Sequence, residues 1–112
     1  MKKEKRKQNL WALFLKENSQ NYMKITDIKV DSRYKKSFRK LPPIIQRKAI
    51  LRINIFRENS FNPRLKTHSL SGREEDCWSF WVDYNYRIKF IFLSQNRGKV
   101  LFLDIGTHEI YQ

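Results

Sequence analysis

Cysteine is nearly absent from this chain of 112 residues, because Cys77 is the only one. A single thiol cannot form a disulfide within the chain, nor can it build a cysteine-based zinc site. This usage fits the reducing cytoplasm, which is the compartment we expect. The spacing of the histidines and carboxylates does not indicate a metal site either, so we expect no metal and no other cofactor.

Long apolar runs are also lacking. The run Leu10–Leu15 is too short to span a bilayer and has no small-residue cleavage site, so it predicts neither a membrane anchor nor a signal peptide. We interpret residues 1–22 as a basic N-terminal extension, either a dispensable arm or a segment that precedes the true initiator, Met23. Residues 23–112 are expected to form a single domain with one modest core.

Acidic residues are few. The chain has 11 Asp and Glu against 24 Lys and Arg, which gives a formal net charge of +13, and Glu58 is the only acid between Arg33 and Arg73. Such one-sided charge predicts a polyanionic partner, namely nucleic acid, the ribosome, an acidic protein or an anionic membrane surface. Its local concentration favours a nucleic-acid footprint over a surface that only keeps the protein soluble.

The first half of the domain has the pattern of one strand followed by two helices. Alternation predicts a strand over residues 24–31, with Ile25 out of phase. A short basic helix with an apolar stripe follows, and a Pro-Pro pair separates it from a second helix over Pro43–Glu58. The side chains expected on the inner side of the second helix are Ile45, Ala49, Ile53 and Phe56, with Leu51 and Ile55 at its margin.

The second half is rich in β-branched and aromatic residues that alternate with polar ones, which predicts half-buried antiparallel strands. These strands are expected over residues 65–71, 77–83 and 86–93, and from residue 99 into the GTH segment at 106–108. Gly98 is expected in the left-handed position of the last hairpin loop. The order β-α-α-β-β-β-β predicts an α+β fold, in which two N-terminal helices pack on a mostly antiparallel sheet.

Four segments in this order resemble the RelE/ParE superfamily, the toxins of type II toxin–antitoxin systems. They are KSFRKLP with the IIQRKAILRI helix, LKTHSLSG, CWSFWVDYNYRIKF and LDIGTHEIY, and together they cover about residues 23–111. Within the superfamily the chain most resembles the RelE/YafQ-type mRNA endoribonucleases. The resemblance implies a small fold similar to that of microbial RNases, cleavage of messenger RNA in the decoding site of the ribosome, and a cognate antitoxin that holds the toxin inactive.

The resemblance also implies catalytic roles for two histidines. YafQ-like toxins carry one in a D-H-x-L-x-G segment, which THSLSG matches from its second position, so that role passes to His68. They carry another in G-[ST]-H near the end, and that role passes to His108.

The same comparison shows three departures. Relatives often have an aromatic residue four positions beyond the second histidine, whereas Tyr111 stands three beyond it. Where YafQ-like toxins have a further histidine and a nearby aspartate, this chain has Trp81 and Asn85. The catalytic set of this chain is therefore expected to differ in part from theirs.

His68 and His108 are the only histidines of the chain, and both lie beside small polar residues near strand ends. Metal-free RNA cleavage needs a base for the 2′-OH, an acid for the departing 5′-oxygen and a cation for the charge that grows on phosphorus. Because imidazoles titrate near neutral pH, we expect these two as the acid–base pair, without assigning which is which. We expect Arg87 at the scissile phosphate and Tyr111 in proton transfer or base stacking.

The residues expected to bind RNA are cationic or aromatic, and they are Arg64, Lys66, Arg73, Trp81 and Lys89. Each candidate also has a plain structural interpretation. The cations would be solvated charges, with Arg87 paired to Asp83, and Trp81 would pack under the C-terminal segment. By strand parity His68 would be a packed core residue, and His108 would be a surface residue at the chain end.

The leading hypothesis is a toxin that acts as a metal-independent, ribosome-dependent mRNA endoribonuclease, with an antitoxin, mRNA and the ribosome as partners and without membrane contact. A ParE-like inhibitor of DNA gyrase would share the fold without RNA chemistry. A basic nucleic-acid-binding module would carry its histidines incidentally. Both alternatives would keep their activity if the two histidines were replaced by alanine. The oligomeric state is not predicted.

Overall fold

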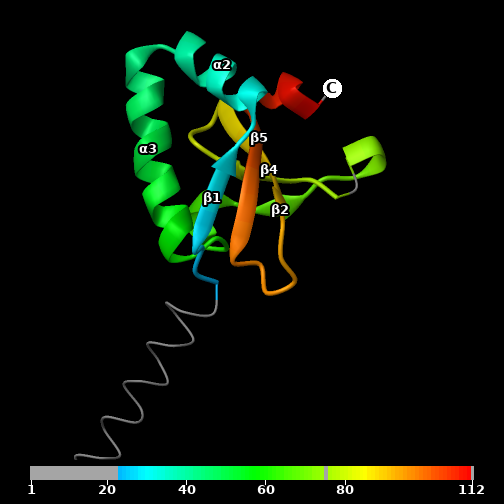
Figure 1. Ribbon diagram of the computed structural model, residues 1–112. Helices are drawn as coiled ribbons and strands as arrows, with labels where there is room; N and C mark the ends of the chain where they lie inside the picture. Colours follow the sequence, from blue (N-terminus) through cyan, green and yellow to red (C-terminus); the bar gives the residue numbers. More distant parts are fainter. Residues whose placement is uncertain (1–22, 75, 112) are drawn as a thin grey trace, which may run out of the picture.

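The computed structural model of the protein describes residues 23–74 and 76–111 (Figure 1). The proposed extension, residues 1–22, lies outside the described part. The helices and strands are β1 (Asp27–Val30), α2 (Ser32–Lys40), α3 (Pro43–Glu58), β2 (His68–Ser69), β3 (Trp78–Trp81), β4 (Tyr86–Phe92) and β5 (Lys99–Thr107). The described residues also include three 3₁₀ turns: η2 (Pro63–Leu65) between α3 and β2, η3 (Gly72–Glu74) between β2 and β3, and η4 (His108–Tyr111) after β5. The predicted β-α-α-β-β-β-β order and the α+β class are confirmed.

The five strands form one sheet in the order β1-β5-β4-β3-β2. Strands β2 to β5 pair antiparallel with their neighbours, and β1 pairs parallel with β5. A parallel pair needs a long crossover connection, and β1 and β5 have one, because both helices and the other three strands lie between them in the chain. The sheet is therefore mostly antiparallel, as predicted.

A cluster of phenylalanine rings joins the helices to one face of the sheet. The ring of Phe56 from α3 stacks on Phe80 of β3 with 4.4 Å between centroids, and it meets Phe90 and Phe102 edge-on at 5.0 and 5.8 Å. Tyr34 of α2 packs on Phe102 at 5.4 Å. Each of these rings is buried, and burying such a side chain contributes about 1.5–3 kcal/mol. Both helices thus cover the same face, and the opposite face remains for the strand residues of opposite parity.

The helix boundaries follow their capping residues. The Asp31 carboxylate accepts a hydrogen bond from the Arg33 amide at 3.0 Å and so caps α2, and Pro43 opens α3. The predicted bounds of α3 are confirmed. The prediction that Leu51 widens its inner side is wrong, since Leu51 is 64% exposed. The helical period places it about 200° around the axis from buried Ala49.

Two local predictions fail where the backbone turns left-handed. The strand expected over residues 65–71 is reduced to β2, because η2 and the left-handed Lys66 (φ 51°) interrupt the extended chain. In the last hairpin loop Arg97, not Gly98, takes the positive φ, at 60°. Gly98 lies in a tight place instead, since a Cβ there would be 3.2 Å from Asn96 Oδ1 and that side chain would have to shift slightly.

The first strand begins later than predicted, at Asp27. Ile25, which was out of phase with the strand pattern, is a core residue, and its amide donates to the Arg57 carbonyl at the end of α3. Val30, which was in phase, is more than a third exposed at the sheet edge. The alternation was therefore a poor guide to burial in this edge strand.

Candidate active site

Strand register places several candidate residues at one end of the sheet. Trp81 pairs with Arg87 across β3 and β4, and Arg87 in turn pairs with Gly106 of β5. On the outer side of β3, His68 of β2 pairs with Ser79. His108 follows the last residue of β5 and begins η4. Four separate segments of the chain therefore meet here.

These segments surround an open hollow of about 460 Å³, called here the histidine hollow. Its lining residues are His68, Trp81, Tyr84, Asn85, Arg87 and His108. Both histidines are exposed rather than packed in the core. The structure thus brings together the two imidazoles and the guanidinium that the sequence predicted as a catalytic set.

The imidazole of His68 is oriented by the backbone just before it. Its Nδ1–H donates to the Lys66 carbonyl at 2.8 Å, and a carbonyl can only accept, so Nδ1 must carry a proton. The left-handed conformation of Lys66 turns that carbonyl into position. The nitrogen that remains to exchange protons is therefore Nε2.

Arg87 is held by two carbonyls and one aromatic ring. Its Nη1 donates to the carbonyls of Asp83 at 2.6 Å and Tyr86 at 3.1 Å, and its Cζ lies 3.9 Å from the centre of the Trp81 ring. The Asp83 carboxylate points to other groups, since it accepts from the Asn85 and Tyr86 amides and lies 3.6 Å from Lys48 Nζ. The guanidinium is consequently fixed in place through backbone oxygens, and the expected alternative of an Arg87–Asp83 side-chain pair is not what the structure has.

Trp81 is the centre of a cationic and aromatic cluster. Besides Arg87, Lys66 lies over its ring, with Nζ 4.6 Å from the centroid. Tyr84 meets the same ring edge-on at 6.0 Å. Such cation–π contacts hold positive charge beside an aromatic surface. The hollow therefore combines charges for a phosphate with rings suited to a base.

Other predicted residues have different surroundings. Lys89 has its ammonium 3.3 Å from Glu74 and 3.2 Å from the Ile110 carbonyl. Arg64 is exposed on η2. The backbone places Arg73 in η3 and Tyr111 in η4, and their side chains lie outside the described part.

Tyr84 is a lining residue that was not predicted from the sequence. It lies in the turn between β3 and β4, and it is one of the most exposed aromatic side chains of the described residues, at 78%. The available signal was an aromatic residue in a β-turn, where Gly, Asn, Asp, Pro and Ser are usual.

The residues that the structure describes contain no group of three or more His, Cys, Asp or Glu side chains placed to hold a metal ion. Among the same residues, none of the helices has both the length and the apolar character that a bilayer-spanning segment requires.

Comparison with known proteins gave similarity in structure alone. No protein-family model matches the sequence, and no curated protein matches it. A YoeB/ParE toxin from Agrobacterium tumefaciens superposes with a TM-score of 0.63 at 12% identity, covering 74% of this chain and 99% of the other. This chain has the fold of the RelE/ParE toxins.

Two further structures agree. A chain of the toxin–antitoxin complex RelBE2 from Mycobacterium tuberculosis gives a TM-score of 0.61 at 16% identity, covering 77% and 94% of the two chains. A chain of the Escherichia coli DinJ–YafQ toxin–antitoxin complex gives 0.56 at 18% identity, covering 75% and 93%. The predicted RelE-like fold is confirmed, and sequence identities this low establish the fold only.

Proposed function

We propose that the protein is the toxin of a toxin–antitoxin module and a metal-independent endoribonuclease that cleaves mRNA on the ribosome. The observation that carries the proposal is the histidine hollow, in which His68, His108 and Arg87 lie around one open space. The RelE/ParE fold supports it independently.

The reaction is transfer of the phosphoryl group to the neighbouring 2′-oxygen. One imidazole takes the 2′-OH proton while the 2′-oxygen bonds to phosphorus, and the P–O5′ bond breaks as the other, protonated imidazole gives its proton to the 5′-oxygen. The products are a 2′,3′-cyclic phosphate and a 5′-hydroxyl. At His68 the proton is exchanged at Nε2, since Nδ1 is engaged with the Lys66 carbonyl.

Arg87 supplies the positive charge. Because its guanidinium is already fixed by the carbonyls of Asp83 and Tyr86, it loses little conformational freedom when charge develops on the phosphate oxygens. Tyr84, which is largely exposed beside Trp81, offers its ring to a neighbouring base. Lys66, beside Trp81, adds a second cation.

A purified translation system tests the proposal. With the protein added, the mRNA should be cut within its coding region, the upstream fragments should end in 2′,3′-cyclic phosphate or 3′-phosphate, and gyrase should supercoil DNA normally. Omission of ribosomes should suppress the cutting. Intact mRNA together with inhibited gyrase would establish the ParE-like alternative, and mRNA binding without cleavage would establish the nucleic-acid-binding module.

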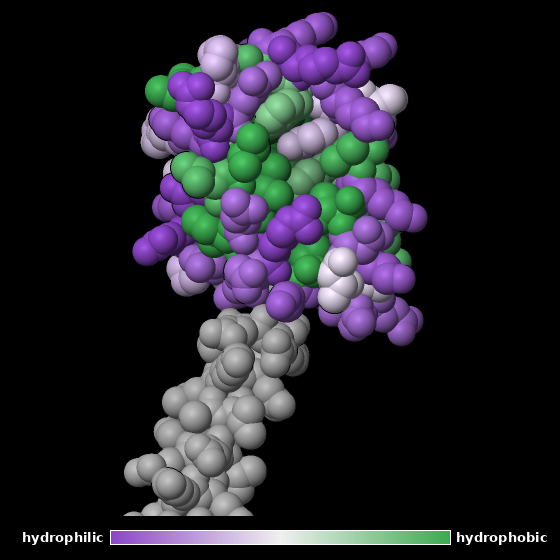
Figure 2. All heavy atoms as spheres, turned by 60° about the vertical axis from the view of Figure 1, so that its left-hand side comes forward, coloured by the Kyte–Doolittle hydropathy of each residue, from purple (hydrophilic) through white to green (hydrophobic). Residues whose placement is uncertain are grey.

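An acidic, amphipathic antitoxin is the proposed protein partner. The outer side of α3 exposes Ile44, Ile50 and Leu51, and Figure 2 shows hydrophobic side chains gathered among hydrophilic ones on the face that includes this helix. Its cations are Arg47, Lys48, Arg52 and Arg57. Apolar side chains surrounded by positive charge suit a segment that is apolar on one side and acidic on the other.

Co-purification with the product of the adjoining reading frame tests this surface. Leu51→Glu should lower recovery of the complex, because it places a carboxylate against an acidic partner. Lys99→Glu on β5, also exposed but far along the chain from α3, is the control and should bind normally. Equal recovery with both variants would contradict docking on α3.

A further inference from the structure

Lys89 was expected to contact RNA, but its side chain is largely enclosed. It is much less exposed than that of Lys48, the other lysine that forms an ion pair among the described residues. Lys89 lies in β4 two residues after Arg87, and its side chain is only 13% exposed. Its ammonium donates to Glu74 Oε2 at 3.3 Å and to the Ile110 carbonyl at 3.2 Å. An ammonium that is largely removed from water requires such partners, so both contacts are integral to its placement.

The Ile110 carbonyl belongs to η4, the turn that begins with His108. A single 3₁₀ turn has poor hydrogen-bond geometry and little stability of its own. η4 instead rests on the sheet: a Cβ on Gly106 would lie 2.8 Å from Ile110 Cγ2, so the turn packs directly on the glycine. Lys89 adds a polar anchor on the same turn.

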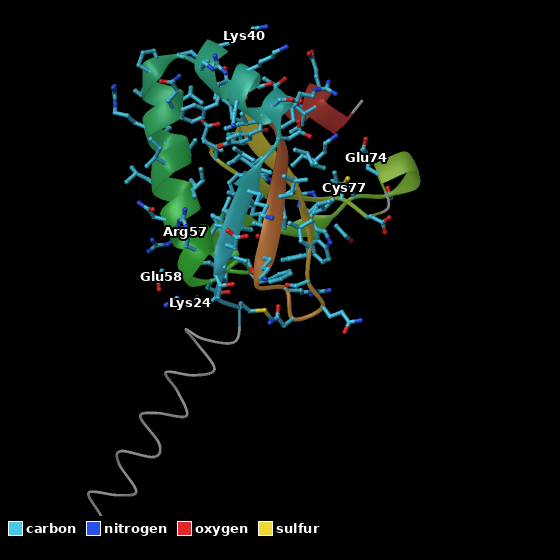
Figure 3. All side chains as sticks on the ribbon, viewed as in Figure 1. Lys24, Lys40, Arg57, Glu58, Glu74 and Cys77 are labelled. Carbon is cyan, nitrogen blue, oxygen red and sulfur yellow. The ribbon has the colours of Figure 1, made fainter. Side chains whose placement is uncertain are left out.

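Glu74, the other partner of Lys89, is fixed in turn. Hydrogen bonding from the Cys77 thiol, and then the Lys89 ammonium, lower the pKa of the Glu74 carboxyl. Glu74 and Cys77 lie close together on the side of the molecule away from α3 (Figure 3). The ionised carboxylate therefore holds the ammonium from one side while the η4 carbonyl receives it on the other.

We propose that Lys89 is a positioning residue, which ties η4 to Glu74 and thereby fixes His108 at the histidine hollow. This inference rests on the proposed ribonuclease function for its kinetic consequence, but not for its structural one. Without the ammonium, η4 loses this polar anchor and must rely on its packing against the sheet, so the His108 ring is less well fixed. A displacement of about 1 Å at a reacting group lowers a rate by about 100-fold.

Lys89→Met tests the proposal, since methionine keeps most of the stem and removes the charge. Two measurements are made on each variant: the maximal mRNA cleavage rate with its half-saturating ribosome–mRNA concentration, and the imidazole NMR signals of both histidines. Lys99→Met, which loses the same charge from an exposed position of β5, is the matched control. Glu74→Gln is a second variant that weakens the same anchor and leaves Lys89 in place.

Lys89→Met should lower the maximal rate about 10- to 100-fold with the half-saturating concentration unchanged. The His108 signals of this variant should shift or broaden, while its His68 signals stay unchanged. Glu74→Gln should show the same pattern more weakly. Lys89→Arg, which keeps the charge, should retain most of the wild-type rate. Lys99→Met should resemble the wild type.

Two results would overturn the inference. One is a raised half-saturating concentration at an unchanged maximal rate, with a reduced salt dependence, which would make Lys89 an RNA contact. The other is an unchanged set of His108 signals. If the wild type itself does not cleave mRNA, the proposed function fails, and the NMR measurement still decides the role of Lys89.

Discussion

At His68 the backbone determines which ring nitrogen is free. The Lys66 carbonyl binds Nδ1, and it can do so because Lys66 adopts a left-handed conformation. The sequence resemblance identified His68, but a lysine with positive φ has no sequence signal, since glycine and asparagine are the usual residues there. The orientation of the ring, and the shortness of β2, therefore could not be predicted.

Trp81 gives the first prediction. Its ring lies against the Arg87 guanidinium at 3.9 Å, and a contact of this kind is worth about 0.5–2 kcal/mol. Trp81→Leu should therefore lower mRNA cleavage about 2- to 30-fold, because the Arg87 guanidinium is less well held. The rate is measured at saturating ribosomes.

Trp81→Phe is the matched control, and it should keep most of the activity because it keeps a ring. Thermal melting of both variants reports any general loss of stability. Full activity of Trp81→Leu in a folded protein would show that the ring neither holds Arg87 nor contacts the RNA.

Among the elements, α3 was the best predicted and η4 the least. The bounds Pro43–Glu58 follow from a proline at the first position and a long apolar period. The C-terminal turn at His108 follows from no such signal, because it depends on contacts with β4, a strand that lies well before it in the sequence. The predicted GTH segment located the histidine but not the turn that carries it.

Gly106→Ala tests the seating of η4. The new Cβ would lie 2.8 Å from Ile110 Cγ2, so the turn must move and His108 with it. We expect a clear loss of cleavage, and a loss of stability of about 1–3 kcal/mol at most, as for other overpacked sites. Cleavage rate and denaturant midpoint are the measurements.

The double variant Gly106→Ala with Ile110→Ala removes the atom that clashes, and it should recover part of the lost activity. A Gly106→Ala protein as active as the wild type would contradict the view that the glycine is required for η4 to pack there.

For the whole molecule, chain length predicted a single domain, and the order of the helices and strands predicted the α+β class. The assembly of the histidine hollow depends on sheet order, which places β2 beside β3 and η4 beside β4. Pairings between distant segments leave little trace in one sequence. The two histidines were therefore predictable as residues, while their meeting at one hollow required the structure.

The boundary at Met23 gives a prediction for the domain. The Met23 carbonyl accepts hydrogen bonds from the Ser60 amide at 3.0 Å and its hydroxyl at 3.2 Å, so this residue is part of the folded unit. A chain that begins at Met23 should melt cooperatively within about 4 °C of the full chain, a change of about 1 kcal/mol or less. A chain that begins after Ile25, which is buried in the core, should melt clearly lower. Unfolding of the chain that begins at Met23 would refute a dispensable extension.

Single-turnover cleavage of ribosome-bound mRNA by the wild type, His68→Ala, His108→Ala and the double variant tests the central claim most directly. Each single replacement should slow cleavage about 10²- to 10⁴-fold. The double variant should be about as slow as the slower single one, because the two imidazoles act in one step. Cleavage at the wild-type rate by either folded single variant would contradict the account.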